Sequence, residues 1–243
     1  VAYLEPISLK KSLITDQDLV LHSFEQELTH KKMYGENFVA FEKETNKMHQ
    51  KRMIQPYANQ LLVINPPNSP LTELEMDTFA LFDVMMNAPH FKYNKRGNIP
   101  AFEMIKNSVT IHRGCFGGCS FCAIAAHQGK FISSRSEKSI LEEVKDLTTR
   151  DYFKGYITDL GGPSANMYKM GGKKISQCEK CARPSCIFPN ICENLNLNHK
   201  TLTQLYRNAS KIPGIKKITI GSGIRYDMLL TKDPNIDQEN GLT

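Results

Sequence analysis

The run His112-Arg113-Gly114-Cys115-Phe116-Gly117-Gly118-Cys119-Ser120-Phe121-Cys122 decides how the rest of the sequence is interpreted. Its three cysteines have the spacing C-x3-C-x2-C, with glycines between them, and they follow an apolar-alternating run at residues 108–111. Thiolates spaced this closely on a glycine-rich backbone can converge on one soft metal centre. Because closed structural sites usually take four protein ligands, three thiolates would leave one metal position open for chemistry. The alternative is three buried thiols that pack as small apolar side chains, which this dense spacing disfavours.

Strand and helix patterns alternate around these cysteines. Two helical patterns separate three strand patterns, which lie at residues 108–111, 155–160 and 217–220. This order predicts an α/β fold with a parallel sheet. Glycines follow the strands, Gly161 and Gly162 among them, and they mark the sheet edge at which α/β proteins bind ligands.

An insertion at residues 164–198 separates the second strand from the second helix and is too long for an ordinary connection. It carries the other four cysteines, Cys178, Cys181, Cys186 and Cys192. Four thiolates would supply the crosslink that a polar loop lacks, and both zinc and a second iron–sulfur cluster fit this ligand count. Unligated thiols in a mobile loop are the alternative.

We predict two domains: a mainly helical N-terminal or linking region at residues 1–105, and a second domain at residues 106–243. Ser23 and Gln26 have the spacing of a capping box at the start of a helix. A short buried strand is expected at residues 60–64, just before an Asn-Pro-Pro stop.

Composition limits the class of protein. Hydrophobic residues make up 40% and charged residues 23%, as in ordinary soluble globular proteins. No apolar run approaches the roughly 20 residues that cross a bilayer, so no membrane partner is expected. The start of the chain lacks the basic and apolar regions of a signal peptide. An odd number of cysteines, seven, then indicates reduced metal-binding thiols in a cytoplasmic protein rather than a disulfide framework.

A nucleic-acid partner has limited support. The net charge of +6 is scattered along the chain, which is typical of a solvated surface. A loop-like stretch at residues 88–100 interleaves aromatic and basic side chains, a pattern that can stack on and pair with nucleic acid, although a solvated loop is the simpler interpretation. These side chains are Phe91, Lys92, Tyr93, Lys95 and Arg96.

The cysteine run resembles the signature of the radical S-adenosylmethionine (radical SAM) enzymes. More narrowly, several runs are similar to those of the YgiQ-type radical SAM proteins, a large and poorly characterised branch, and the similarity covers most of residues 20–228. The runs are Ile64-Asn65-Pro66-Pro67, Ile99-Pro100-Ala101-Phe102-Glu103-Met104-Ile105, Arg113-Gly114-Cys115-Phe116-Gly117-Gly118-Cys119, Ser134-Arg135-Ser136-Glu137, Asp159-Leu160-Gly161-Gly162-Pro163 and Gly223-Ile224-Arg225-Tyr226-Asp227.

The resemblance implies a fold and a chemistry. The fold would be a partial (β/α) radical SAM barrel of about three βα units, preceded by the mainly helical segment. Cys115, Cys119 and Cys122 would hold three irons of a [4Fe–4S] cluster, whose fourth iron would chelate the amino and carboxylate groups of S-adenosylmethionine. An electron donor such as flavodoxin or ferredoxin would reduce the cluster. Cleavage of the cofactor would then give methionine and a 5′-deoxyadenosyl radical that abstracts hydrogen from an unknown substrate.

The same resemblance suggests residues around the cofactor. Phe121 offers an apolar platform for the adenine, with packing beneath the loop as the alternative. Gly161 and Gly162 stand where the superfamily's glycine-rich motif meets the methionine ammonium, although Pro163 replaces the frequent glutamate. Either Arg113 or Arg135 would be suited to pair with the cofactor carboxylate, unless each makes an ordinary ion pair.

The chain departs from the family pattern in extent. It shows fewer βα units than a full barrel, so we expect an internal fragment that is inactive by itself. Two alternatives to a radical SAM enzyme stay open: a zinc-binding nucleic-acid module, and an iron–sulfur electron-transfer protein without S-adenosylmethionine chemistry.

Overall fold

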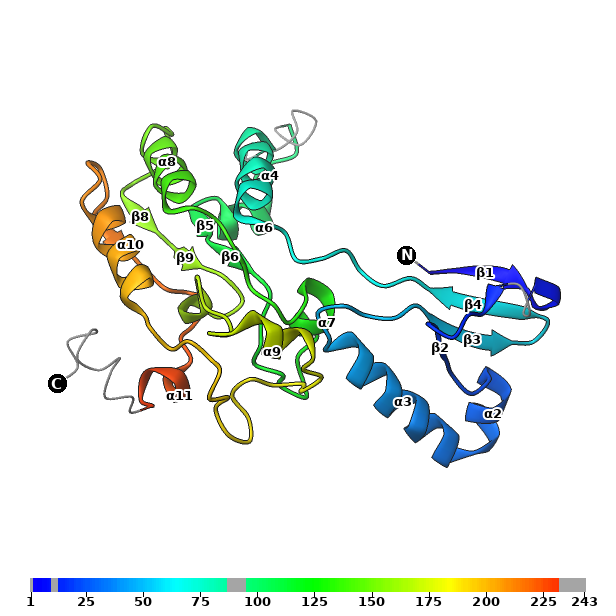
Figure 1. Cartoon of the computed structure of the whole chain (residues 1–243). Helices are drawn as coiled ribbons and strands as arrows, with labels where there is room; N and C mark the ends of the chain where they lie inside the picture. The colour runs from blue at the N-terminus through cyan, green and yellow to red at the C-terminus, as the bar shows by residue number, and fades with distance from the viewer. Residues whose placement is uncertain (1, 10–12, 87–94, 232–243) are drawn as a thin grey trace. The chain divides into compact units, whose positions relative to one another are not determined.

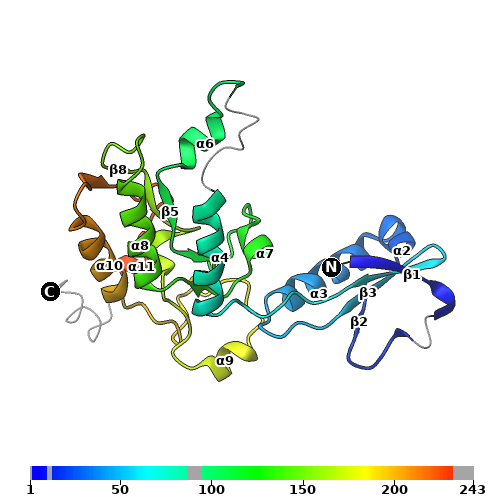
Figure 2. The same ribbon diagram turned by 90° about the horizontal axis from the view of Figure 1, so that it is seen from above.

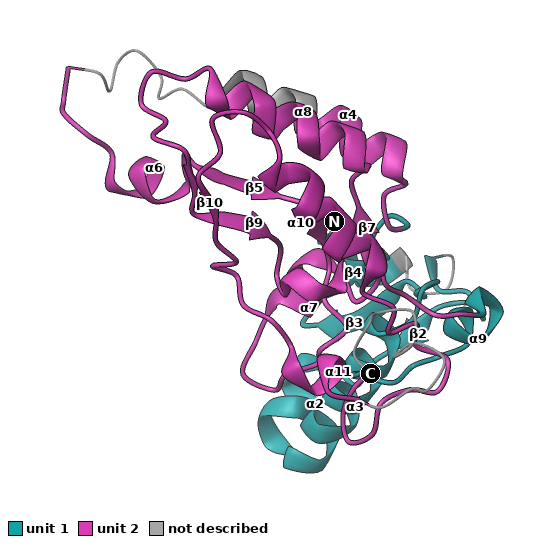
Figure 3. Cartoon of the chain, turned by 90° about the vertical axis from the view of Figure 1, so that its left-hand side faces the viewer, with its two compact units in different colours: residues 1–69, 174–185 teal, residues 70–173, 186–243 magenta. Residues whose placement is uncertain are grey.

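The computed structural model describes residues 2–9, 13–86 and 95–231, which form a mixed α/β protein (Figure 1). The chain divides into two compact units, residues 1–69 with 174–185 and residues 70–173 with 186–243 (Figure 3). The domain boundary expected between residues 105 and 106 stays a prediction.

The first unit is built on a four-stranded sheet flanked by helices. Its elements are β1 (Ala2–Pro6), η1 (Ile7–Leu9), β2 (Leu19–Val20), α2 (Phe24–Thr29), α3 (Lys31–Thr45), β3 (Met53–Tyr57), β4 (Gln60–Ile64) and α9 (Ile175–Glu179). The strand order is β1-β4-β3-β2. β4 pairs antiparallel with β1 and β3, whereas β2 pairs parallel with β3. Ile54, Leu61 and Val63 on the two central strands are fully buried and form the core of this sheet.

The expectation of a mainly helical N-terminal region is therefore wrong in part. The predicted strand at residues 60–64 is present, but it is one of four strands. β1 and β3 contain Pro6 and Pro56, residues that weaken a local strand signal. They are extended because each pairs along its length with β4, a contact between distant segments that no local pattern reveals.

The expected capping box is present at the start of α2. The Ser23 hydroxyl accepts a hydrogen bond from the Gln26 N–H at 3.3 Å, and the Gln26 side-chain oxygen accepts one from the Ser23 N–H at 2.9 Å. These two bonds satisfy two N–H groups that the first turn of a helix leaves without partners. The local signal for this helix was therefore sufficient.

The second unit contains short strands that alternate with helices. Its elements are α4 (Glu73–Met86), α6 (Pro100–Ile105), β5 (Ser108–Thr110), β6 (His112–Arg113), α7 (Ile124–Gln128), β7 (Ser133–Ser134), α8 (Glu137–Thr148), β8 (Tyr156–Ile157), β9 (Asp159–Gly161), η2 (Ala165–Met167), α10 (Lys200–Ser210), β10 (Lys217–Ile218) and α11 (Tyr226–Leu229). β5 pairs parallel with β9, and β10 pairs parallel with β8. The parallel pairing expected from the sequence is confirmed for these strands.

Hydrogen bonds around Thr158 link the two small parallel pairs. The Thr158 N–H donates to the Asn107 carbonyl at 3.0 Å, and the Leu160 N–H donates to the Thr219 carbonyl at 3.1 Å. The segment that contains β8 and β9 thus lies between the β5 and β10 segments. Over the described residues these sheets form no closed barrel. The partial barrel consequently remains a proposal.

One apolar core joins these strands to α8 and α10, which lie alongside them (Figures 1 and 2). α8 contributes Ile140, Val144 and Leu147 to this core. The helix begins at Glu137, because Ser136 is the N-cap and its hydroxyl accepts a hydrogen bond from the Ser139 N–H at 3.1 Å. Among the described residues, no helix is both long and apolar enough to span a membrane.

Candidate metal centre on the cysteine loop

A short antiparallel pair closes the base of the cysteine loop. β6 enters the loop and β7 leaves it, with His112 opposite Ser134 and Arg113 opposite Ser133. The Cys115 N–H donates to the Gly129 carbonyl at 3.0 Å, which ties the first cysteine to the end of α7. The three cysteines therefore lie on a loop that both flanking strands fix.

Gly114 allows the chain to turn into this loop. Its φ of +91° lies in the region that side chains rarely adopt, and a Cβ there would come within 2.3 Å of the Phe131 carbonyl oxygen. The backbone angle and the nearby carbonyl therefore exclude any residue other than glycine at position 114, unless the backbone shifts. The glycine before the first cysteine is thus a requirement of the turn.

Two of the sulfur atoms converge on Gly117. A Cβ at this residue would lie 3.3 Å from the Cys115 Sγ and 3.7 Å from the Cys119 Sγ. The Gly117 N–H also donates to the Cys115 Sγ at 3.4 Å. Cys122 is brought back toward Cys119 by a turn in which its N–H donates to the Cys119 carbonyl at 3.0 Å. The loop thus supplies three soft sulfur donors, the donor type that iron–sulfur clusters take.

The surroundings of Cys115 favour its thiol form until a metal is bound. Burial raises the pKa of the Cys115 thiol, and the neighbouring Cys119 and Cys122 sulfurs act in the same direction. A bound metal would reverse this direction because it coordinates the thiolate. In the part of the chain that the structure describes, no three cysteine, histidine or carboxylate side chains are already gathered as a metal site. The residues fit a thiolate-bound cluster in donor type and number, and the loop would have to close around it.

Phe116 anchors the loop to the rest of the unit. Its ring is buried in a small core with Met167, Met170 and Met228. Cys115, Cys186 and Cys192 are partly buried against the same core, and the Cys186 N–H donates to the Phe116 carbonyl at 3.0 Å. The second half of the cysteine-rich insertion therefore packs under the first cysteine of the loop.

The structure divides the four cysteines of the insertion between the two units. Cys178 and Cys181 belong to the first unit, where the Cys181 N–H donates to the Cys178 carbonyl at 3.1 Å. Cys186 and Cys192 belong to the second, where the Cys192 N–H donates to the Cys186 carbonyl at 2.8 Å. All seven cysteines are described and carry thiols rather than disulfide bonds. A shared metal at the insertion stays a prediction.

Phe121 points into solvent, with 91% of its surface exposed. It does not pack beneath the loop, so the alternative to an adenine platform is not found. An aromatic ring this exposed beside three cysteines is available to stack on a planar ligand. Its role in cofactor binding stays a prediction.

The glycine pair after β9 lies close to His112. The Gly161 carbonyl accepts a hydrogen bond from the Ile111 N–H at 2.8 Å and so belongs to the sheet. A Cβ at Gly162 would lie 2.5 Å from the His112 Cε1. His112 is completely buried, and neither of its ring nitrogens has a hydrogen-bond partner among the described residues. Burial lowers its pKa to about 4, so the imidazole is neutral.

The arginine beside the cysteines is one that sequence reasoning missed. Arg135 is buried in an ion pair with Glu143 and also donates to the Thr110 carbonyl at 3.0 Å, so it serves the fold. Arg113 is exposed. Arg225 instead donates from its Nη1 to the Cys119 Sγ at 3.4 Å. In the sequence, Arg225 stands out only as part of the run at residues 223–227, which carries the family resemblance but does not indicate a contact with the cysteines.

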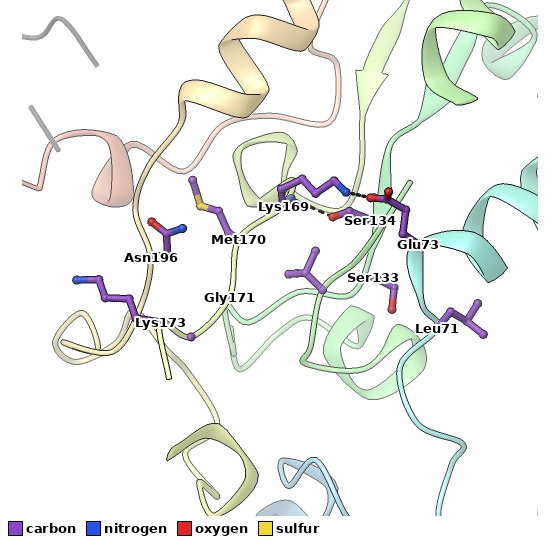
Figure 4. Close-up of a pocket in the computed structure, with 11 residues that line it drawn as sticks. Leu71, Glu73, Ser133, Ser134, Lys169, Met170, Gly171, Lys173 and Asn196 are labelled. Carbon is purple, nitrogen blue, oxygen red and sulfur yellow. Dashed lines mark hydrogen bonds and ion pairs between the residues drawn. The ribbon is translucent and has the colours of Figure 1, made fainter. Parts of the chain in front are cut away.

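A pocket of about 480 Å³ lies between β7, the start of α4 and the loop after Lys169 (Figure 4). The Lys169 ammonium pairs with the Glu73 carboxylate, and the Lys169 N–H donates to the Ser134 hydroxyl at 2.9 Å. Lys169 has a positive φ of 58°, which a residue with a side chain rarely adopts. Its charge is thus already engaged by its neighbours in the second unit.

The chain is similar to known proteins over most of its length. Residues 3–108 match the family model described as Radical SAM N-terminal. A UPF0313 protein of Bacteroides thetaiotaomicron is 53% identical over 88% of this chain and 34% of its own length. UPF0313 proteins of Porphyromonas gingivalis and Shewanella oneidensis are 48% and 44% identical over 95% and 89% of this chain.

The match at residues 3–108 and these relatives identify the chain as a radical SAM protein. More narrowly, the chain belongs to the YgiQ-type radical SAM family, whose UPF0313 members are its relatives. The chain spans about a third of the length of the curated relatives it matches.

Proposed function

We propose that this chain carries the cluster-binding part of a radical SAM enzyme. Cys115, Cys119 and Cys122 would hold three irons of a [4Fe–4S] cluster and leave the fourth open to S-adenosylmethionine. The observation that supports this most is the approach of the Cys115 and Cys119 sulfurs to one side of Gly117, on a loop that β6 and β7 hold in place. When bound, the cluster would supply the electron that cleaves S-adenosylmethionine to methionine and a 5′-deoxyadenosyl radical.

The chain's own residues would bind and shield these groups. The exposed Phe121 ring would stack on the adenine, and Gly162 would offer its backbone groups to the cofactor on the side that the His112 ring does not fill. Gly161 is less available than expected, because its carbonyl already accepts from Ile111. Phe116 and its buried neighbours would keep water away from one side of the loop. The substrate stays unassigned, and flavodoxin or ferredoxin is the proposed electron donor.

Product analysis tests this proposal. A protein of the relatives' full length that contains this chain should be reconstituted anaerobically with iron and sulfide, then given S-adenosylmethionine and dithionite. We expect 5′-deoxyadenosine from the parent and none from Cys119→Ala. Reversible reduction without 5′-deoxyadenosine would instead favour the electron-transfer alternative.

The zinc alternative concerns the insertion. Cys178, Cys181, Cys186 and Cys192 remain a proposed second metal site, for zinc or for another cluster. Metal analysis of the purified protein decides between them. Zinc that is lost in Cys178→Ala, with iron retained, would assign a separate structural zinc. The loop proposed for nucleic acid lies largely outside the described residues, which include only Lys95 and Arg96 of its basic and aromatic side chains.

A further inference from the structure

The Arg225 guanidinium reaches into the cysteine loop from a distant part of the chain. Its Nη1 donates to the Cys119 Sγ at 3.4 Å, although the two residues are 106 positions apart. A Cβ at Gly117 would come within 3.1 Å of the same nitrogen. Gly117 therefore leaves room for the guanidinium beside the sulfurs of Cys115 and Cys119.

Several contacts fix Arg225 in this place. Its Nε and Nη2 donate to the two carboxylate oxygens of Asp227 at 3.2 and 2.5 Å. Its backbone N–H donates to the Asn166 side-chain oxygen at 2.8 Å, and its carbonyl accepts from the Asn166 amide at 2.9 Å. Asn166 is only 1% exposed and lies 3.1 Å from the His199 Nε2. A surface arginine with only a solvated ion pair would lack these buried backbone contacts.

We propose that Arg225 is a positioning residue that donates a hydrogen bond to the Cys119 thiolate of the loaded protein and raises the reduction potential of the cluster. This inference rests on the proposed function, because it requires Cys119 to be an iron ligand. One electron from a reductant of the flavodoxin or dithionite class enters the cluster, and no atom or proton is transferred to Arg225.

The physical reason is a difference between two oxidation states. Reduction adds one negative charge to the cluster and its thiolates. A cationic donor next to a ligand sulfur stabilises that added charge more than it stabilises the oxidised state. Asp227 offsets part of the positive charge but also orients the planar guanidinium, so that Nη1 remains directed at sulfur. Loss of the guanidinium should therefore make the cluster harder to reduce.

The test is a redox titration, followed by electron paramagnetic resonance, without S-adenosylmethionine. The variants are Arg225→Met and Arg225→Gln, which are neutral, and the control is Arg207→Met, an exposed arginine on α10. We expect parental iron content in all three. At the parent's midpoint potential, the ratio of reduced to oxidised cluster should fall about tenfold in the Arg225 variants, a shift of about −59 mV for one electron. The control should match the parent.

Three outcomes would contradict the inference. Parental potentials in both loaded Arg225 variants would overturn it. Weaker binding of S-adenosylmethionine by these variants would not rescue the inference, because it would show that Arg225 serves the cofactor carboxylate instead. If Arg225→Met takes up no iron, the midpoint potential of Arg225→Gln decides alone: a lower potential supports the inference and a parental potential overturns it. Failure of both to load while Arg207→Met loads would make Arg225 part of what holds the cluster and would reject a tuning role. A parent without iron would refute the proposed function and this inference together.

Discussion

The imidazole of His112 packs against Gly162, with its Cε1 2.5 Å from the position that a Cβ at residue 162 would occupy. The ring is fully buried, and it lacks hydrogen-bond partners within the described residues. The contact connects the start of the cysteine loop to the glycine pair. Burying the two ring nitrogens without partners lowers the stability of the fold, because buried polar groups without hydrogen bonds cost free energy.

Gly162→Ala should destabilise the protein by about 1–3 kcal/mol, because the methyl group would overlap the His112 ring. Gly171→Ala is the matched control, since nothing lies within 4 Å of its added Cβ. Chemical denaturation measures both. The same substitution in a His112→Ala background should cost much less. Equal losses in the two backgrounds would show that the ring is not what excludes a side chain.

Stability should fall as the pH drops below neutrality. Burial lowers the pKa of His112 from 6.5 in the unfolded chain to about 4 in the folded protein, so the unfolded state binds the proton more readily between these values. The free energy of unfolding is therefore highest above pH 6.5 and decreases progressively toward pH 4. The loss at pH 5 is about 2 kcal/mol. Denaturation of the metal-free protein at pH 7 and pH 5 checks it.

His112→Phe should remove most of that pH dependence. Burial also lowers the pKa of His199, so a smaller dependence of the same sign should remain. Identical pH dependence in His112→Phe and the parent would mean that the imidazole is not buried as the structure shows.

Glu143→Ala should cost about 3 kcal/mol or more, because it leaves the buried Arg135 guanidinium without its carboxylate. Glu142→Gln is the control: its pair with Lys138 is exposed and spans 3.9 Å, so its loss should cost at most about 0.5 kcal/mol. Denaturant midpoints compare them. Similar small losses would imply that Arg135 is available for a ligand after all.

Gly35→Ala should stabilise the first unit by about 0.5–1 kcal/mol. Gly35 lies within α3, and its added Cβ would meet nothing within 4 Å. Gly97→Ala serves as the contrast, because that site is equally open but has a φ of +90°, which strains any side chain. Thermal unfolding should therefore shift in opposite directions for the two variants.

Local patterns predicted the elements that depend on local interactions. The capping box at Ser23 and the parallel strands that follow the alternating pattern were both expected. The N-terminal sheet was missed because β1 and β3 are stabilised by pairing with β4. Arg225 was missed because its approach to Cys119 depends on folding across 106 residues. The burial of His112 likewise depends on β9, which lies far along the chain.

The most direct test of the central claim is the iron and sulfide content of two variants after anaerobic reconstitution. One replaces Cys115, Cys119 and Cys122 by alanine; the other replaces Cys178 and Cys181. We predict that the loop variant loses about four irons per chain relative to the parent, whichever metal the insertion holds, and that the insertion variant keeps these four. An iron content in the loop variant equal to that of the parent, with or without a loss from the insertion variant, would contradict the assignment of Cys115, Cys119 and Cys122 as the cluster ligands.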